Sequence, residues 1–353
     1  MIHAHRRDRL RRVVLESGLD GPLLVTDLAN VRYLTGFSGS NAVLVISPDP
    51  AGDRIGTDGR YRDQVAEQCP DLPTVIDRQT LSAVARGCTD VIVESSLTIG
   101  EVRDLRELGI QTATLGPVIE GFRAVKDSVE IAALERACTI TAAAFAALAG
   151  EIRVGDTERG LARRLEQLFG EGGAEDRAFP SIVASGPHSA IPHHEPGGRR
   201  LAAGDLLVID AGARVDGYHA DMTRTFLVAA DAGAWQAEVH EAVRRAQAAA
   251  VSACRPGAQA RAVDAEARTV LAAAGFEAVF THGLGHGVGL VIHEAPMIGQ
   301  HATGTIDANM AITAEPGAYL LGRGGVRIED TLVVTDSGPR ILTEAPRDLM
   351  VVG

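Results

Sequence analysis

The sequence is poor in cysteine and in long apolar runs, and both absences narrow the class of protein. Its 353 residues include only 4 cysteines, with no CxxC pair and no metal-ligand spacing, so they are expected to be reduced packing residues. No apolar run approaches the 18 residues of a membrane span, and no signal-peptide core follows the arginines near the N-terminus. These absences predict a cytoplasmic protein without a membrane partner.

An excess of positive charge is also missing, since the formal net charge is −12. Nucleic-acid binding depends on clustered Lys and Arg that neutralise phosphates, so no nucleic-acid partner is expected. The one basic cluster, Arg6–Arg12, is interpreted as the exposed face of a first helix over His5–Ser17.

The length predicts two domains, because single cores stop growing at about 250–300 residues. In residues 1–121, strands alternate with helices, which indicates an α/β domain without a reactive constellation. Residues Asn30–Gly39 are expected to form a loop within it. A long helix from Ser128 to Leu148 follows a change of pattern, so a second domain is predicted over residues 122–353.

The stretch Leu206–Phe226 carries the first chemical signal. An apolar run ends abruptly in Asp210, and a buried carboxylate there needs a partner. Asp221 lies 11 positions further on, and the turn residues Asp216-Gly217 between them predict a hairpin. A turn centred between residues 215 and 216 sets the two acids opposite each other, whereas a turn on Asp216-Gly217 makes them diagonal neighbours.

In either register the two carboxylates converge. Like charges this close raise one pKa strongly unless a multivalent cation neutralises both, so metal binding is the sharper interpretation. In the alternative interpretation, Asp210 caps the turn and Asp221 lies on a solvated strand face.

A second stretch joins three histidines with four glycines. It contains His282, His286 and His293, and glycine at this density lets the backbone approach a ligand closely. The spacing does not say which histidine binds a metal, and a glycine-rich loop with solvated histidines is the alternative.

Two further acids repeat the design of Asp210. Glu315 ends an apolar run before Pro-Gly, and Glu329 ends another, two residues after Arg327. Taken singly, Glu329 fits a surface pair with Arg327. Taken together, four carboxylates and at least one imidazole are a ligand set for two divalent ions, which hold a shared hydroxide as nucleophile.

The ordered motifs ID-AGA…GYHADMTRTF, HGLGHGVGL…HE, AEPG and GVRIED resemble the pita-bread-fold metallopeptidases, which include methionine aminopeptidase, aminopeptidase P and prolidase. The resemblance covers about residues 122–353 and implies an α+β catalytic domain. It implies five metal ligands, namely Asp210, Asp221, His286, Glu315 and Glu329.

The resemblance also implies substrate contacts. His193, His282 and His293 match substrate-contacting histidines, and Arg327 matches an arginine of the Xaa-Pro-cleaving branch. The chain departs from the family at His188, where relatives often carry Asn, which could alter the pocket edge. His194 leaves the assignment of His193 ambiguous by one position.

The first 121 residues resemble the smaller domain of aminopeptidase P, prolidase and creatinase, through NVRYLTGFSGSNAVLVI and TDGRY. Methionine aminopeptidases generally lack this domain, so its presence indicates the aminopeptidase P and prolidase branch of the family. In relatives it helps form dimers and closes part of the neighbouring active site, so a homodimer acting on short proline-containing peptides is implied.

The expected function is therefore hydrolysis of the bond before a penultimate proline, by an aminopeptidase or a dipeptidase. Glu315 would transfer the proton of the nucleophile, and His293 with His193 would stabilise the oxyanion and the prolyl side. Carboxylate ligands favour Mn²⁺, with Co²⁺ or Zn²⁺ possible. The alternatives are a creatinase-like amidinohydrolase and a non-catalytic binding protein of the same fold.

Overall fold

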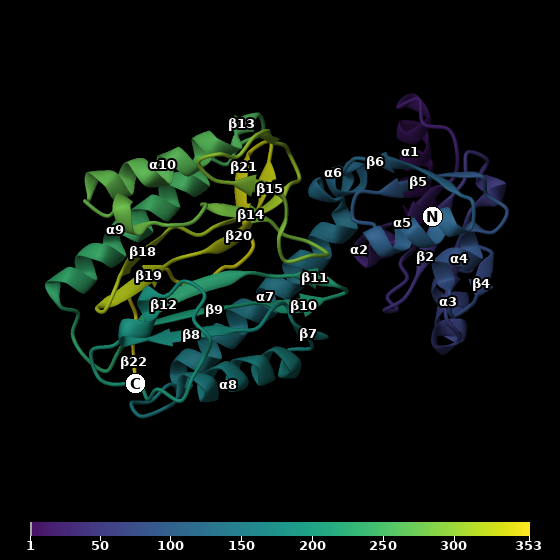
Figure 1. Ribbon diagram of the computed structural model, residues 1–353. Coiled ribbons are helices and arrows are strands. Elements are labelled where there is room, and N and C mark those ends of the chain that lie inside the picture. The colour runs from purple at the N-terminus through teal and green to yellow at the C-terminus, as the bar shows by residue number, and fades with distance from the viewer. Residues whose placement is uncertain (1) are drawn as a thin grey trace. The chain divides into compact units, whose positions relative to one another are not determined.

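The computed structural model describes residues 2–353, and the chain divides into two compact units, residues 1–123 and 124–353 (Figure 1). The sequence placed the division after residue 121.

The first unit is built on one six-stranded mixed sheet with the strand order β4-β3-β2-β1-β5-β6. Its strands are β1 (Leu23–Val25), β2 (Val43–Ile46), β3 (Arg54–Thr57), β4 (Thr74–Ile76), β5 (Asp90–Glu94) and β6 (Gln111–Leu115). Its helices are α1 (Ile2–Glu16), α2 (Leu28–Thr35), α3 (Arg62–Gln68), α4 (Thr80–Ala85), α5 (Ile99–Glu107) and α6 (Val118–Ala124), with 3₁₀ turns at Pro50–Gly52 and Gly59–Tyr61. The expected α/β class of this unit is confirmed.

The loop expected at Asn30–Gly39 was a wrong prediction, because most of it is helix α2. Asp27 caps the helix by accepting the Asn30 amide, and Gly36 ends it at a φ of 81°. These are ordinary start and stop signals, but they enclose only 8 residues, too few for a clear helical period.

The basic cluster on α1 was also interpreted wrongly, since Arg6, Arg7 and Arg11 are buried. Their guanidinium groups donate to the backbone carbonyls of Tyr33, Leu34 and Ser47 at 2.8, 3.0 and 2.7 Å. Arg11 also donates to the buried Asp53 carboxylate at 2.6 Å. These arginines therefore tie α1 to the rest of the unit through hydrogen bonds that the pattern of apolar residues does not reveal.

The second unit contains four long helices. They are α7 (Ser128–Glu151), α8 (Glu158–Glu171), α9 (Ala234–Ala253) and α10 (Ala260–Ala273). Asp127 and Glu130 form a capping box that begins α7. By length and composition alone, α7 could cross a membrane, although no membrane span was predicted from the sequence. In the structure, 44% of its most apolar window is buried inside the protein.

This unit contains two larger sheets, one of four strands and one of five. The first has the order β22-β12-β9-β8 and the second β15-β14-β17-β20-β21. Apolar residues of α7 and α8 pack on the first sheet, and those of α9 and α10 pack on the second. The α+β pita-bread class is confirmed.

The strands of this unit are mostly short. They are β7 (Asp176–Arg177), β8 (Ile182–Ser185), β9 (Leu206–Ala211), β10 (Ala213–Val215), β11 (Tyr218–His219), β12 (Met222–Val228), β13 (Ala258–Gln259), β14 (Gly285–Gly287), β15 (Glu294–Ile298), β16 (Thr305–Ile306), β17 (Ala311–Ala314), β18 (Gly317–Leu320), β19 (Gly324–Arg327), β20 (Asp330–Thr335), β21 (Gly338–Ile341) and β22 (Val351–Val352). The segments Gly186–Ala190 and Glu277–Val279 are 3₁₀ turns.

The hairpin register selects one of the two predicted arrangements. Val215 pairs with Tyr218, and Asp210 pairs with Thr223. The turn is Asp216-Gly217, with φ angles of 50° and 79°, as a two-residue hairpin turn requires. Asp221 therefore lies diagonally from Asp210 on the same face of the hairpin.

Candidate metal centre

A cavity of about 1060 Å³ opens within the second unit, and all five predicted metal ligands line it. They come from separate elements. Asp210 lies on β9, Asp221 precedes β12, His286 lies on β14, Glu315 follows β17 and Glu329 precedes β20. The fold thus collects acids that are up to 119 positions apart in the sequence into one cavity.

Three of the carboxylates each have one buried oxygen without a hydrogen-bond partner among residues 2–353. Asp210 accepts from Arg327 at 2.6 Å through Oδ2, and Glu329 accepts from Thr223 at 2.6 Å through Oε2. The other oxygen of each, and Oδ1 of Asp221, is buried without a hydrogen-bond partner among residues 2–353. A buried carboxylate oxygen left unpaired is costly, so this donor set fits divalent cations.

His286 directs a ring nitrogen toward two of the predicted ligand carboxylates, those of Asp221 and Glu315. Its Nδ1 lies 3.0 Å from the Gly287 carbonyl, which assigns the proton to Nδ1. Nε2 then carries a lone pair 3.6 Å from Asp221 Oδ2 and 3.4 Å from Glu315 Oε1. A lone pair facing two carboxylates is repulsive unless a cation or proton lies between them, and a histidine held this way is the usual form of a metal ligand.

Burial perturbs the titration of these groups. It raises the pKa of Glu315 to about 8 and the pKa values of Asp221 and Glu329 well above their ordinary range, with neighbouring carboxylates adding to the effect. Burial also lowers the pKa of His286 to about 4. In the metal-free enzyme, burial therefore favours the protonated forms of Glu315, Asp221 and Glu329 and a neutral His286 imidazole, which a cation could bind.

The three other predicted histidines line the same cavity. His282 Nε2 lies 2.8 Å from the hydroxyl of Tyr319, and burial lowers the His282 pKa to about 4. His193 and His293 are exposed. The His293 ring stands perpendicular to that of His286, with 4.4 Å between ring centres. His293 is thus an exposed imidazole of the cavity that lies against the proposed ligand His286.

Arg327 is buried and is not the surface partner of Glu329 considered from the sequence. Its guanidinium donates to Asp210, to Thr223 at 3.1 Å, to the Tyr319 hydroxyl at 2.9 Å and to the Pro192 carbonyl at 3.3 Å. This arginine therefore fixes one oxygen of Asp210 and links the cavity to the segment that carries His193.

Comparison with known proteins identifies the family. The profile of metallopeptidase family M24 matches residues 132–336, and that of the creatinase/prolidase N-terminal domain matches residues 6–125. The chain belongs to metallopeptidase family M24. The resemblance drawn from the motifs is thereby confirmed.

Individual M24 relatives cover both units. The chain is 34% identical to the Xaa-Pro dipeptidase of Pyrococcus furiosus over 98% of its own length and 99% of that protein. The solved Xaa-Pro dipeptidase from Bacillus anthracis has a TM-score of 0.94 and 32% identity, covering 99% of this chain and 100% of that one. The X-Pro aminopeptidase from Thermotoga maritima has a TM-score of 0.89 and 31% identity, covering 98% and 99%.

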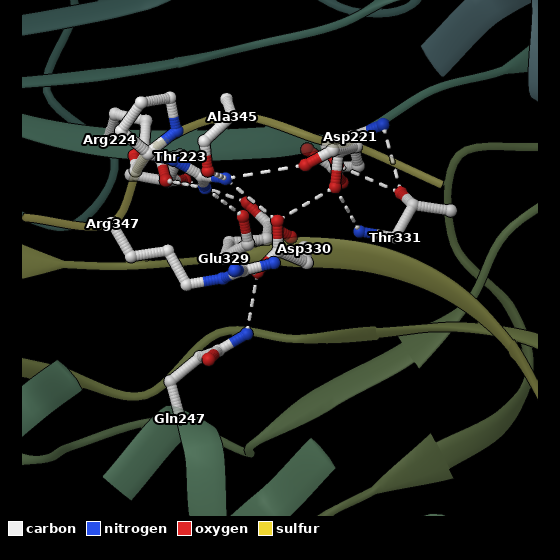
Figure 2. A network of polar contacts seen from close by, with 11 residues as sticks. Asp221, Thr223, Arg224, Gln247, Glu329, Asp330, Thr331, Ala345 and Arg347 are labelled. Atoms are coloured by element: carbon white, nitrogen blue, oxygen red, sulfur yellow. Dashed lines mark hydrogen bonds and ion pairs between the residues drawn. The ribbon is translucent and has the colours of Figure 1, made fainter. Parts of the chain in front are cut away.

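In this M24 peptidase, a polar network centred on Asp330 lies next to the Glu329 ligand position (Figure 2). The sequence analysis did not predict it. Asp330 accepts from Arg224 at 2.8 Å, Gln247 at 2.7 Å and Arg347 at 2.5 Å. Arg224 in turn donates to the backbone carbonyl of Glu329 at 2.5 Å. The network thus holds the chain at Glu329, and its only sequence signal was a second acid directly after that residue.

Glu158, at the start of α8, is the centre of a second group that the sequence did not reveal. Its fully buried carboxylate accepts from His188 Nδ1 and His194 Nε2, both at 2.9 Å. His194, which also lines the cavity, therefore faces Glu158, and so does His188, which is not among the lining residues. His193 makes no such contact and is the member of the pair free to meet a substrate.

Proposed function

We propose that this M24 peptidase is a dinuclear exopeptidase that hydrolyses the bond between an N-terminal residue and a following proline. The observation that carries the proposal is the set of three buried carboxylate oxygens, on Asp210, Asp221 and Glu329, left without partners around one cavity. The printed activities of the relatives support the choice of substrate.

The proposed metal ligands are Asp210, Asp221, His286, Glu315 and Glu329. When bound, two divalent ions would supply an acidified water as nucleophile and would polarise the scissile carbonyl. We propose Mn²⁺, because carboxylate oxygens outnumber the single imidazole, while Co²⁺ and Zn²⁺ suit the same donors.

The other residues act on the substrate and on protons. Glu315, which lines the cavity beside His286, accepts a proton from the nucleophile and passes it to the leaving nitrogen. His293 faces the cavity beside His286 and stabilises the oxyanion, while His193 contacts the prolyl side. Arg327 and His282 meet at the Tyr319 hydroxyl and hold this wall of the cavity in place.

Proline is selected because the Xaa-Pro bond is a tertiary amide with a fixed φ, which peptidases that require the N–H handle poorly. The test compares Ala-Pro and Met-Pro peptides with Ala-Ala and Met-Ala peptides in metal-loaded enzyme. We expect a preference for proline of at least roughly 10² in kcat/KM, about 2.7 kcal/mol. Faster cleavage of Met-Ala peptides would place the enzyme with the methionine aminopeptidases.

A creatinase-like or non-catalytic protein is the alternative. Creatinase-like relatives have lost the metal ligands, whereas this chain retains acids and His286 at all five positions, which favours the peptidase. We further propose that the enzyme is a cytoplasmic homodimer, with an N-terminal domain over residues 1–121 and a catalytic domain over 122–353. Light scattering and metal analysis of purified protein test these points.

A further inference from the structure

The segment that carries His193 is anchored on both sides of that residue. On one side, the Pro192 carbonyl accepts from Arg327 at 3.3 Å. On the other side, His194 Nε2 binds Glu158 Oε2 at 2.9 Å. His193 itself projects from this anchored turn, lines the cavity and is exposed.

Glu158 is the common acceptor for the whole segment from residue 185 to 197. Its Oε1 accepts from the Ser185 amide at 2.9 Å, the Ser185 hydroxyl at 2.8 Å and His188. Its Oε2 accepts from His194 and from the Gly197 amide at 3.2 Å. One buried carboxylate thus joins both ends of a loop that is otherwise mostly irregular.

The contacts of Glu158 also distinguish it from a metal ligand. Glu158, His188 and His194 form a group of residue types able to bind an ion. However, both imidazole nitrogens lie at 2.9 Å from carboxylate oxygens that also accept other donors, whereas Asp210, Asp221 and Glu329 each retain an unpaired oxygen. Both carboxylate oxygens of Glu158 therefore accept hydrogen bonds from protein donors, and the group is satisfied without an ion.

We propose that Glu158 is a positioning residue, which acts through His194 and the 185–197 loop to hold His193 against the substrate. The inference rests on the proposed function for its catalytic consequence, since it assumes that His193 contacts the substrate. His188 supports the same carboxylate from the opposite end of the loop. Its ring lies 4.3 Å from that of His194, centre to centre.

The first test measures amide hydrogen exchange across residues 182–200, which needs neither substrate nor metal. In Glu158→Gln, the new amide NH₂ faces the donor at Gly197 or at Ser185, so one end of the loop loses its acceptor. We expect exchange across the loop to accelerate at least tenfold. Glu171→Gln, an exposed site on the same helix that pairs with Arg164 at 3.0 Å, is the matched control and should leave the loop unchanged.

The second test is a double-mutant cycle on Xaa-Pro cleavage. Glu158→Gln should lower kcat/KM about tenfold, mainly through KM, in the wild-type background. It should change kcat/KM by less than twofold in the His193→Ala background, because its effect passes through His193. Equal losses in both backgrounds would mean a general structural role and would overturn the proposal.

A conservative replacement gives a further control. His188→Asn keeps a side-chain N–H donor for Glu158, whereas His188→Leu removes it. We expect near-normal exchange and KM in the first variant and a loosened loop in the second. If metal analysis instead finds an ion that Glu158→Gln removes while the five cavity ligands stay loaded, the group is a third metal site. If the wild-type enzyme cleaves no Xaa-Pro peptide, the proposed function fails, and unchanged exchange in Glu158→Gln alone refutes the positioning of the loop.

Discussion

In the metal-free enzyme, the stability contributed by Glu315, Asp221 and Glu329 should fall as the pH rises from about 5 to 8, because burial favours their protonated forms. Burial raises the pKa of Glu315 from 4.5 to about 8, so the folded state holds a proton that the unfolded state has released. The stability from this proton is fully present below pH 4.5 and is lost as the pH rises through 8. Asp221 and Glu329, whose pKa values are also raised, contribute with the same sign.

The size of the effect follows from the shift. At about 1.36 kcal/mol per unit, a pKa change from 4.5 to about 8 gives an upper value of roughly 5 kcal/mol for Glu315 alone. About 18% of its side chain is exposed, so water screens part of this energy and we expect at least about 2 kcal/mol. For a domain of this size that corresponds to roughly 4–8 °C in Tm.

The assay is thermal unfolding of chelator-treated enzyme at pH 5.5 and 8.0, with metal-loaded enzyme as reference. Loaded enzyme should gain or keep stability at the higher pH, because cations bind the deprotonated ligands. Glu315→Gln removes the titrating group, so its metal-free Tm, relative to that of the wild type at the same pH, should rise between pH 5.5 and 8.0. The lowered pKa values of His286 and His282 act with the opposite sign below about pH 6.5 in both proteins, and they cancel in this comparison. A Tm difference between the two proteins that does not change with pH would refute the burial argument.

The remaining predictions concern single residues. Asp221→Ala and Glu329→Ala should each abolish activity and release at least one ion while the protein stays folded, which metal analysis and circular dichroism check; unchanged metal content in both would disprove their role as ligands. His286→Ala should likewise lose one ion. His293→Ala should retain its metal but lower turnover by about 10²-fold or more, the size of a lost proton-transfer or oxyanion contact, and loss of both ions there would make His293 a ligand. Arg327→Ala should lower Xaa-Pro cleavage without loss of metal, measured by kcat/KM and elemental analysis, and wild-type kcat/KM would contradict its assignment.

Local signals in the sequence predicted the elements that depend on neighbours in the chain. The convergence of Asp210 and Asp221 in one hairpin follows from the turn residues between them, which left two registers open until the structure selected the turn at Asp216-Gly217. The same reasoning singled out Asp210, Glu315 and Glu329, because each ends an apolar run, whereas the full set of five proposed ligands came from the resemblance to the metallopeptidases. A carboxylate in that position is unusual enough to be noticed without knowledge of its partners.

Polar side chains whose partners are distant in the sequence were not predictable in this way. Glu158 lies in the first turn of α8, a common position for an acid, and its imidazole partners lie 30 and 36 positions away. Arg6 and Arg7 looked like a solvated face, although each binds a carbonyl 27 positions away. Composition and periodicity describe apolar burial, whereas these contacts depend on the finished fold.

The hydrogen bonds of Arg327 bear on whether the enzyme prefers dipeptides or longer peptides. Four of its five N–H donors already bind Asp210, Thr223, Tyr319 and the Pro192 carbonyl. Its charge is largely compensated by Asp210, so it can offer a substrate carboxylate only one further hydrogen bond. A strong preference for dipeptides over longer peptides would therefore require a further hydrogen-bond donor at the cavity. We propose that His193, which lines the cavity and is exposed, supplies this contact, so that the preference for dipeptides or longer peptides would depend on the loop that Glu158 holds.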